Sequence, residues 1–303
     1  MKSLPRRRAA ALVAAAALIA IAAAVVEGLR SFWQRPEAVV RLGARLAGVA
    51  PFPERGAEPC PWTVPRPAGA RKPLVLLVLG QSNAGNHGGE ALPHRPPATA
   101  GTASAVVTAF DGKACHRLGD PLPGGTGRDR SIWTLLEGEL ARLGEPREVV
   151  LSLLAVEGTT VAEWTHPGSP LRSELGRWLA ARDARHFPAD FVLWQQGEAD
   201  AREGTSAARY VQGLEALREQ LRGAGVRAPI LLARSTRCRS GAGGAVIRAA
   251  QDALIARHAD VRAGADTDAL AGPLRQDDCH FTAAGLQAAA RAWGAVLAAS
   301  LPG

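Results

Sequence analysis

Leu74-Val75-Leu76-Leu77-Val78-Leu79 is a run of six apolar residues that leads into Gly80-Gln81-Ser82-Asn83. A continuous Leu/Val run of this length is typical of a strand buried on both faces, as in a parallel sheet. The glycine allows a sharp turn that a Cβ would obstruct. Ser82 therefore follows the carboxyl end of a predicted central strand, where open α/β sheets bind their ligands. A serine there is either a turn residue or a nucleophile, and the second role needs a base from elsewhere in the chain.

Four further apolar runs predict strands, and the segments between them predict helices. The runs lie at 105–110, 149–156, 191–194 and 229–233. Strands that alternate with helices are typical of βαβ units. We therefore predict a three-layer α/β/α sandwich around a flavodoxin-like, parallel, five-stranded sheet. Residues 111–130 are rich in glycine, and we predict a long loop there.

The positive charge of the chain is concentrated near its amino terminus. The 303 residues have a formal net charge of +8. Residues 1–45 contain eight basic and two acidic side chains, whereas the rest contains 28 basic and 26 acidic ones. The rest is nearly neutral and lacks the basic stripe with interspersed aromatic residues that is typical of nucleic-acid binders. We expect no nucleic-acid partner.

Arg6-Arg7-Arg8 precede an uncharged apolar run at residues 9–26. Its length lies between that of a signal-peptide core and that of a membrane-spanning helix, and the preceding arginines predict that the bulk of the chain is exported. We predict a signal anchor or a signal peptide at 1–30, with an uncleaved membrane anchor slightly favoured. Residues 31–73 are interpreted as a Pro/Arg-rich linker with a short helix at 36–46. The domain at 74–300 is then outside the cytoplasm, either membrane-anchored or, after cleavage, secreted or periplasmic.

Cys60, Cys115, Cys238 and Cys279 fit an exported protein with disulfide bonds, and their spacing resembles no zinc site. Their number alone leaves three pairings open. Their positions favour one, because Cys238 follows the last predicted strand and Cys279 lies in the loop before the last helix. These two segments meet at the same edge of the sheet. We therefore predict a Cys238–Cys279 bond. The two cysteines that are left, Cys60 and Cys115, would then form the second bond.

Groups suited to acyl transfer follow the predicted strands. Ser82, Gly158 and Gln196 come directly after three of them, and Asp277 and His280 lie in the loop before the last helix. The carboxyl ends of parallel strands share one edge of a sheet, so these residues should converge. The spacing of Asp277 and His280 lets one short turn place a carboxylate against an imidazole. A serine esterase needs a nucleophile, a base, a group that orients the base, and donors for an oxyanion.

Three sequence blocks resemble those of the SGNH hydrolase superfamily. They are Gly80-Gln81-Ser82-Asn83, Trp194-Gln195-Gln196-Gly197-Glu198-Ala199-Asp200 and Asp277-x-x-His280-Phe281. Within the superfamily they are similar to the sialate O-acetylesterase-like carbohydrate esterases, and the resemblance covers about residues 74–297. The chain departs from the family at Glu157, where relatives usually have Gly, and at Ala84, where they usually have Met.

The resemblance implies a catalytic triad of Ser82 as nucleophile, His280 as base and Asp277 as the partner of the base. It also implies an oxyanion hole formed by the N–H groups of Ser82 and Gly158 and the side chain of Gln196.

Asn83 and Glu198 are expected to support this site. Glu198 and Asp200 suggest a metal or acid/base pair as an alternative, but we interpret them as groups that hydrogen-bond loop backbone and hold Gln196 in place. His87 and His94 lie in a Gly/Pro-rich stretch and are interpreted as solvated side chains.

The expected function is hydrolysis of an O-acetyl or similar short acyl ester, on a carbohydrate, through an acyl-serine intermediate. The acetylated carbohydrate is the expected partner, and the membrane is a second one through the amino-terminal segment. No metal or other cofactor is implied. Two alternatives remain open: an O-acetyltransferase that acts on an envelope glycan, and a catalytically silent glycan-binding domain.

Overall fold

A mixed sheet forms the centre of the protein. The computed structural model describes residues 36–301 except 67, 90–106, 183–186 and 240–242. These residues form an eight-stranded sheet in the order β1-β4-β3-β5-β2-β6-β7-β8. β4 pairs antiparallel with β1 and β3, and every other pairing is parallel. The strands are β1 (Ala57–Glu58), β2 (Leu74–Gly80), β3 (Val107–Phe110), β4 (Cys115–Leu118), β5 (Val149–Ala155), β6 (Phe191–Gln195), β7 (Ile230–Arg234) and β8 (Val261–Asp266).

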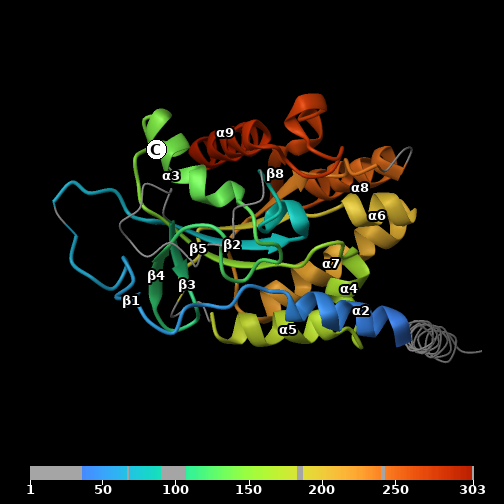
Figure 1. Cartoon of the computed structure of the whole chain (residues 1–303), viewed down its shortest axis with the longest axis horizontal. Coiled ribbons are helices and arrows are strands. Elements are labelled where there is room, and N and C mark those ends of the chain that lie inside the picture. The colour runs from blue at the N-terminus through green and yellow to red at the C-terminus, as the bar shows by residue number, and fades with distance from the viewer. Residues whose placement is uncertain (1–35, 67, 90–106, 183–186, 240–242, 302–303) are drawn as a thin grey trace, which may run out of the picture.

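Helices cover both faces of the sheet (Figure 1). One face carries α3 and α9, and the other carries α2, α4, α5 and α7. The helices are α2 (Pro36–Ala47), α3 (Leu136–Arg142), α4 (Val161–Thr165), α5 (Pro170–Ala180), α6 (Glu198–Glu203), α7 (Ala207–Gly223), α8 (Gly243–Arg257) and α9 (Ala283–Ser300). The predicted α/β sandwich is confirmed.

β2 is buried along its whole length, as its unbroken apolar sequence predicts. Successive side chains of a strand point to opposite faces, so one strand serves two cores. Val75, Leu77 and Leu79 belong to the core shared with α5, α7 and α8, while Leu74, Leu76 and Val78 belong to the core shared with α3 and α9. The end of β2 is therefore fixed from both sides.

The prediction of five strands is wrong in number and in membership. The strands β5-β2-β6-β7-β8 reproduce the flavodoxin-like order 2-1-3-4-5, so β8 is the fifth strand of that unit and β3 lies outside it. β8 was missed because it is an edge strand whose residues are partly exposed, so it has no apolar run. β4 was missed because it lies within the glycine-rich stretch 111–130, which we predicted as a loop.

The segment predicted as a linker packs against the domain. The predicted helix at 36–46 is present as α2, and Leu42 on it is fully buried in the core beside α5. Further along, Cys60 is bonded to Cys115 at the start of β4. The predicted signal or anchor at 1–30 lies outside the described residues. Within the described part of the chain, no helix combines the length and the apolar character needed to cross a membrane.

The packing of α2 predicts a stability difference between two positions of that helix. Leu42→Ala should lower the free energy of unfolding by about 2–4 kcal/mol, because it leaves a cavity in the core. Val40 is 71% exposed, so Val40→Ala should change the stability by less than about 0.5 kcal/mol. Urea unfolding followed by circular dichroism measures both. Equal midpoints for the two variants would show that α2 is not part of the cooperative fold.

Candidate active site

Ser82 lies in a tight turn directly after β2. The turn needs glycine at position 80, because a Cβ there would lie 2.1 Å from the carbonyl oxygen of Gln195. Ser82 begins a 3₁₀ turn, Ser82–Ala84, and is 4% exposed. Among the described residues, no acceptor takes its backbone N–H. The turn thus presents a hydroxyl and a free backbone donor at the carboxyl edge of the sheet.

Asp277 and His280 form the pair that their spacing predicts. The Asp277 Oδ2 atom lies 2.8 Å from His280 Nδ1, while Oδ1 accepts the backbone N–H groups of His280 at 2.6 Å and of Cys279 at 3.0 Å. Burial favours the neutral carboxyl, but these hydrogen bonds and the His280 charge outweigh it and lower the pKa of Asp277. Asp278 lies beside Arg237 instead, with an N–O distance of 3.5 Å. The imidazole is therefore oriented by Asp277.

Asn83 connects the Ser82 turn to the loop that carries His280. Its Nδ2 atom donates to the carbonyl oxygen of Cys279 at 3.1 Å and to Glu198 Oε1 at 2.8 Å. The same Glu198 oxygen accepts the hydroxyl of Ser235 at 2.7 Å. Glu198 is fully buried, and burial raises its pKa although both hydrogen bonds lower it. Glu198 thus contacts the side chains of Asn83 and Ser235 rather than Gln196, which we expected it to hold, and the supporting role of Asn83 and Glu198 stays a prediction.

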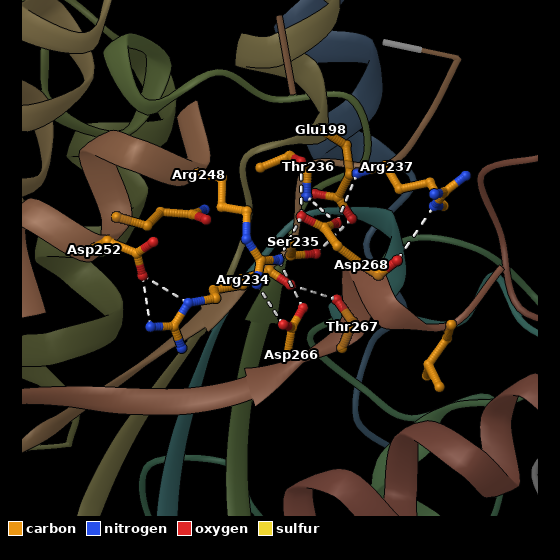
Figure 2. Close-up of polar contacts among 12 residues, drawn as sticks. Glu198, Arg234, Ser235, Thr236, Arg237, Arg248, Asp252, Asp266, Thr267 and Asp268 are labelled. Atoms are coloured by element: carbon orange, nitrogen blue, oxygen red, sulfur yellow. Dashed lines mark hydrogen bonds and ion pairs between the residues drawn. The ribbon is translucent and has the colours of Figure 1, made fainter. Parts of the chain in front are cut away.

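A polar network holds the segment after β7, where Ser235 lies (Figure 2). Asp268 accepts the backbone N–H and the hydroxyl of Thr236, both at 2.7 Å, and the backbone N–H of Arg237 at 2.9 Å. Arg248 contacts Asp268 at 3.4 Å and also pairs with Asp266 at the end of β8. The segment after β7 is therefore fixed to the end of β8.

Both predicted disulfides are present, Cys238–Cys279 and Cys60–Cys115. The first joins the segment after β7 to the residue directly before His280. It closes a loop with a sequence separation of 41 residues, which is worth about 3–4 kcal/mol by the chain-entropy relation. The loop that carries the imidazole is thus covalently tied to the sheet. Disulfides of this kind are typical of extracellular or periplasmic proteins.

The loop of residues 157–160 follows β5 and carries Gly158. This glycine has a φ of +61°, a conformation that residues with a side chain rarely adopt. Its backbone N–H has no acceptor among the residues that the structure describes. Because β5 pairs with β2, the loop adjoins the Ser82 turn. Gly158 thus has a second free backbone N–H in this region, and its role as an oxyanion donor stays a prediction.

Gln196 does not offer the predicted donor. It is fully buried, and its Nε2 atom donates to the Thr159 carbonyl at 2.8 Å and to Asp200 Oδ2 at 2.6 Å. Both amide hydrogens are committed, so none remains for a substrate oxygen. Asp200 holds Gln196 as predicted, and burial raises the pKa of Asp200 to about 6. The sequence places Gln196 at a strand end but does not reveal the two acceptors that surround it.

His87 is a residue of this region that we wrongly interpreted as solvated. Its ring stacks on His280 with 5.4 Å between centroids and an interplanar angle of 22°. Its Nε2 atom lies 3.2 Å from Thr126 Oγ1 and 3.4 Å from Glu157 Oε2. Burial, and then the charge of His280, lower the pKa of His87 to about 4. Nothing in the Gly/Pro-rich sequence around it signals this contact, and His94 lies outside the described residues.

Taken together, the groups suit acyl transfer. A hydroxyl, a carboxylate-oriented imidazole and free backbone N–H groups meet at one edge of the sheet. Among the residues that the structure describes, no three His, Cys, Asp or Glu side chains are arranged to hold a metal ion.

Comparison with solved structures gives distant similarity. A protein of Arabidopsis thaliana has 19% identity and a TM-score of 0.58, with 76% of this chain and all of that chain covered. A carbohydrate acetylesterase family member from Sinorhizobium meliloti has 17% identity and a TM-score of 0.46, with 74% and 97% covered. The structure of NanS has 15% identity and a TM-score of 0.48, with 75% and 97% covered.

Sequence comparison identifies the family. No curated protein matches the chain significantly. A family model described as carbohydrate esterase, sialic acid-specific acetylesterase, matches residues 73–300, which include all the groups of the candidate active site. The chain therefore belongs to this carbohydrate esterase family and is a carboxylic ester hydrolase.

Proposed function

We propose that the protein removes O-acetyl or similar short acyl groups from a carbohydrate through an acyl-Ser82 intermediate. The observation that carries the proposal is the Asp277–His280 pair, 2.8 Å apart, on a loop that Asn83 ties to the Ser82 turn. Membership of the carbohydrate esterase family supports the substrate class.

The pair of Asp277 and His280 supplies the base. The carboxylate of Asp277 can only accept, so Nδ1 of His280 carries the proton and donates it in this hydrogen bond. The Nε2 atom of the neutral imidazole is then left as an acceptor. His280 Nε2 takes the hydroxyl proton of Ser82 as the oxygen attacks the ester carbonyl. The carboxylate of Asp277 then faces an imidazolium and stabilises it.

The free backbone N–H groups of Ser82 and Gly158 serve the tetrahedral intermediate. Negative charge develops on the former carbonyl oxygen, and preorganised donors stabilise it most at that moment. His280 gives its proton to the sugar oxygen as the bond between that oxygen and the acyl carbon breaks, so the sugar leaves as an alcohol and the acyl group stays on Ser82. Water, activated by His280, then attacks the acyl carbon, releases the carboxylic acid and restores Ser82.

We also propose that residues 1–30 direct export. The two disulfides support an oxidising compartment. Whether the segment stays as a membrane anchor is decided by comparing the mass of the mature protein with that of the full chain.

Ser82→Ala should abolish esterase activity while the fold is kept, because only a hydroxyl is removed. Loss of a triad member typically lowers kcat by several orders of magnitude. Hydrolysis of p-nitrophenyl acetate and a circular dichroism spectrum test this. A folded variant with near-normal turnover would exclude Ser82 as the nucleophile. An inactive wild-type protein that binds acetylated glycans would instead favour the silent glycan-binding domain.

Asp277 and Asp278 offer a matched pair of substitutions. Asp277→Asn should lower kcat by about 10³-fold or more, because the amide favours the wrong tautomer of His280. Asp278→Asn should have little effect, since Asp278 is partly exposed and its φ of +58° suits asparagine. Steady-state kinetics on p-nitrophenyl acetate compare them. Equal losses would contradict the assignment of Asp277.

The two disulfides should differ in their effect on activity. Replacing Cys238 and Cys279 by Ser should lower kcat by about tenfold or more, because misplacement of a catalytic group is costly. Replacing Cys60 and Cys115 by Ser is the control, which should lower stability with a much smaller change in kcat. Mild reduction of the wild type should likewise reduce activity before unfolding. Equal kcat values for the two double variants would show that the Cys238–Cys279 bond does not position His280 for catalysis.

A further inference from the structure

Arg45, on α2, contacts the loop that carries Gly158. Its Nη1 atom donates to the carbonyl oxygens of Glu157 at 3.1 Å and of Gly158 at 2.8 Å. Its Nη2 atom forms an ion pair with Glu163 at 3.1 Å. The side chains of Arg45 and Glu163 are only 23% and 14% exposed, so solvent screens these contacts weakly. A residue of the predicted linker thus reaches the candidate active site.

The contact with Glu157 acts on the Gly158 donor through one peptide group. The Glu157 carbonyl and the Gly158 N–H are the two ends of that group, which is planar and trans, so they point in opposite directions. A cation at the oxygen fixes the plane and draws electron density toward the oxygen. The N–H on the other side becomes both better oriented and a stronger donor.

Other contacts pin the remaining groups of the 157–160 loop. The Glu157 N–H donates to Thr126 Oγ1 at 2.9 Å, and the Thr159 carbonyl accepts from Gln196. The Thr160 N–H donates to Glu163 Oε2 at 2.8 Å. Among the described residues, only the N–H groups of Gly158 and Thr159 in this loop lack an acceptor. The loop is therefore built to expose donors, and Arg45 is the charged group on its carbonyl side.

We propose that Arg45 is a positioning residue for ester hydrolysis, which holds and polarises the 157–158 peptide so that Gly158 N–H stabilises the oxyanion. The inference rests on the proposed function, in which Gly158 is an oxyanion donor. Charge on the substrate oxygen is largest in the transition state, so Arg45 acts mainly on kcat.

Kinetics of Arg45 variants test the proposal. Arg45→Gln should lower kcat on p-nitrophenyl acetate by about tenfold to a hundredfold, with KM within about twofold, since removal of a whole oxyanion donor costs about 10²–10³-fold. Arg45→Lys, which keeps the charge, should recover part of that loss. Added guanidinium chloride, at non-denaturing concentration, should partly restore kcat of Arg45→Ala. Arg41 is exposed on the same helix and has no ion pair among the described residues, so Arg41→Gln is the control, with wild-type kinetics.

Three outcomes would overturn the proposal: an unchanged kcat, a loss confined to KM, or a loss in Arg45→Gln that Glu163→Gln reproduces in full. The last would mean that Arg45 matters only through its ion pair, because glutamine keeps the acceptor for Thr160. If Arg45→Gln does not fold, Arg45→Lys and the guanidinium experiment decide.

Ser82→Ala separates the role of Arg45 from the proposed mechanism. Esterase activity in Ser82→Ala would refute the mechanism. Loss of activity in Ser82→Ala together with wild-type kcat in the Arg45 variants would refute only the role of Arg45.

Discussion

The buried carboxylate of Glu198 fixes the geometry of the active-site edge. A fully buried carboxylate without hydrogen-bond donors costs several kcal/mol, so the fold must keep its donors in place. These donors are Asn83, beside the candidate nucleophile, and Ser235, at the end of β7. Arg275 adds a nearby positive charge, which opposes the increase in the pKa of Glu198. One side chain at the start of α6 therefore sets the relative positions of loops that are far apart in sequence.

Several independent contacts restrain the loop that carries His280. Arg275 is buried and donates to the carbonyl oxygens of Cys279, Thr267 and Leu270. The disulfide and the contact with Asn83 reach the same residue, Cys279, from two other directions. If His280 is the base, as we propose, an imidazole held in this way loses little conformational freedom when substrate binds, which is one source of rate acceleration. The restraints on the loop thus converge on Cys279, the residue directly before His280.

The sequence predicts those features that depend on local spacing or on topology. An unbroken apolar run predicts β2, and the separation of Asp277 from His280 predicts their contact because one turn spans it. The Cys238–Cys279 bond follows from the shared edge of a parallel sheet. The family blocks place Asn83 and Glu198 directly after two predicted strands, and the two side chains form a hydrogen bond.

Contacts between residues that are far apart in sequence, with no motif or topology to connect them, could not be predicted. The donors of Gln196 are taken by Thr159 and Asp200, and only the packed structure brings these acceptors together. His87 stacks on His280 although its surrounding sequence is that of an ordinary loop. β8 has no apolar run because it borders solvent. The helix α2 was predicted, but its packing against the core was not, because the sequence around it, rich in Pro and Arg, is typical of a linker.

The segment before residue 73 determines where this esterase can be truncated without damage to its fold. A chain trimmed to the family boundaries, 73–300, would lose α2 and Cys60, although both are integrated into the fold. It would open the core where Leu42 is buried and leave a buried thiol at Cys115 without its partner. The folded unit of this protein therefore extends beyond the region that the family model matches.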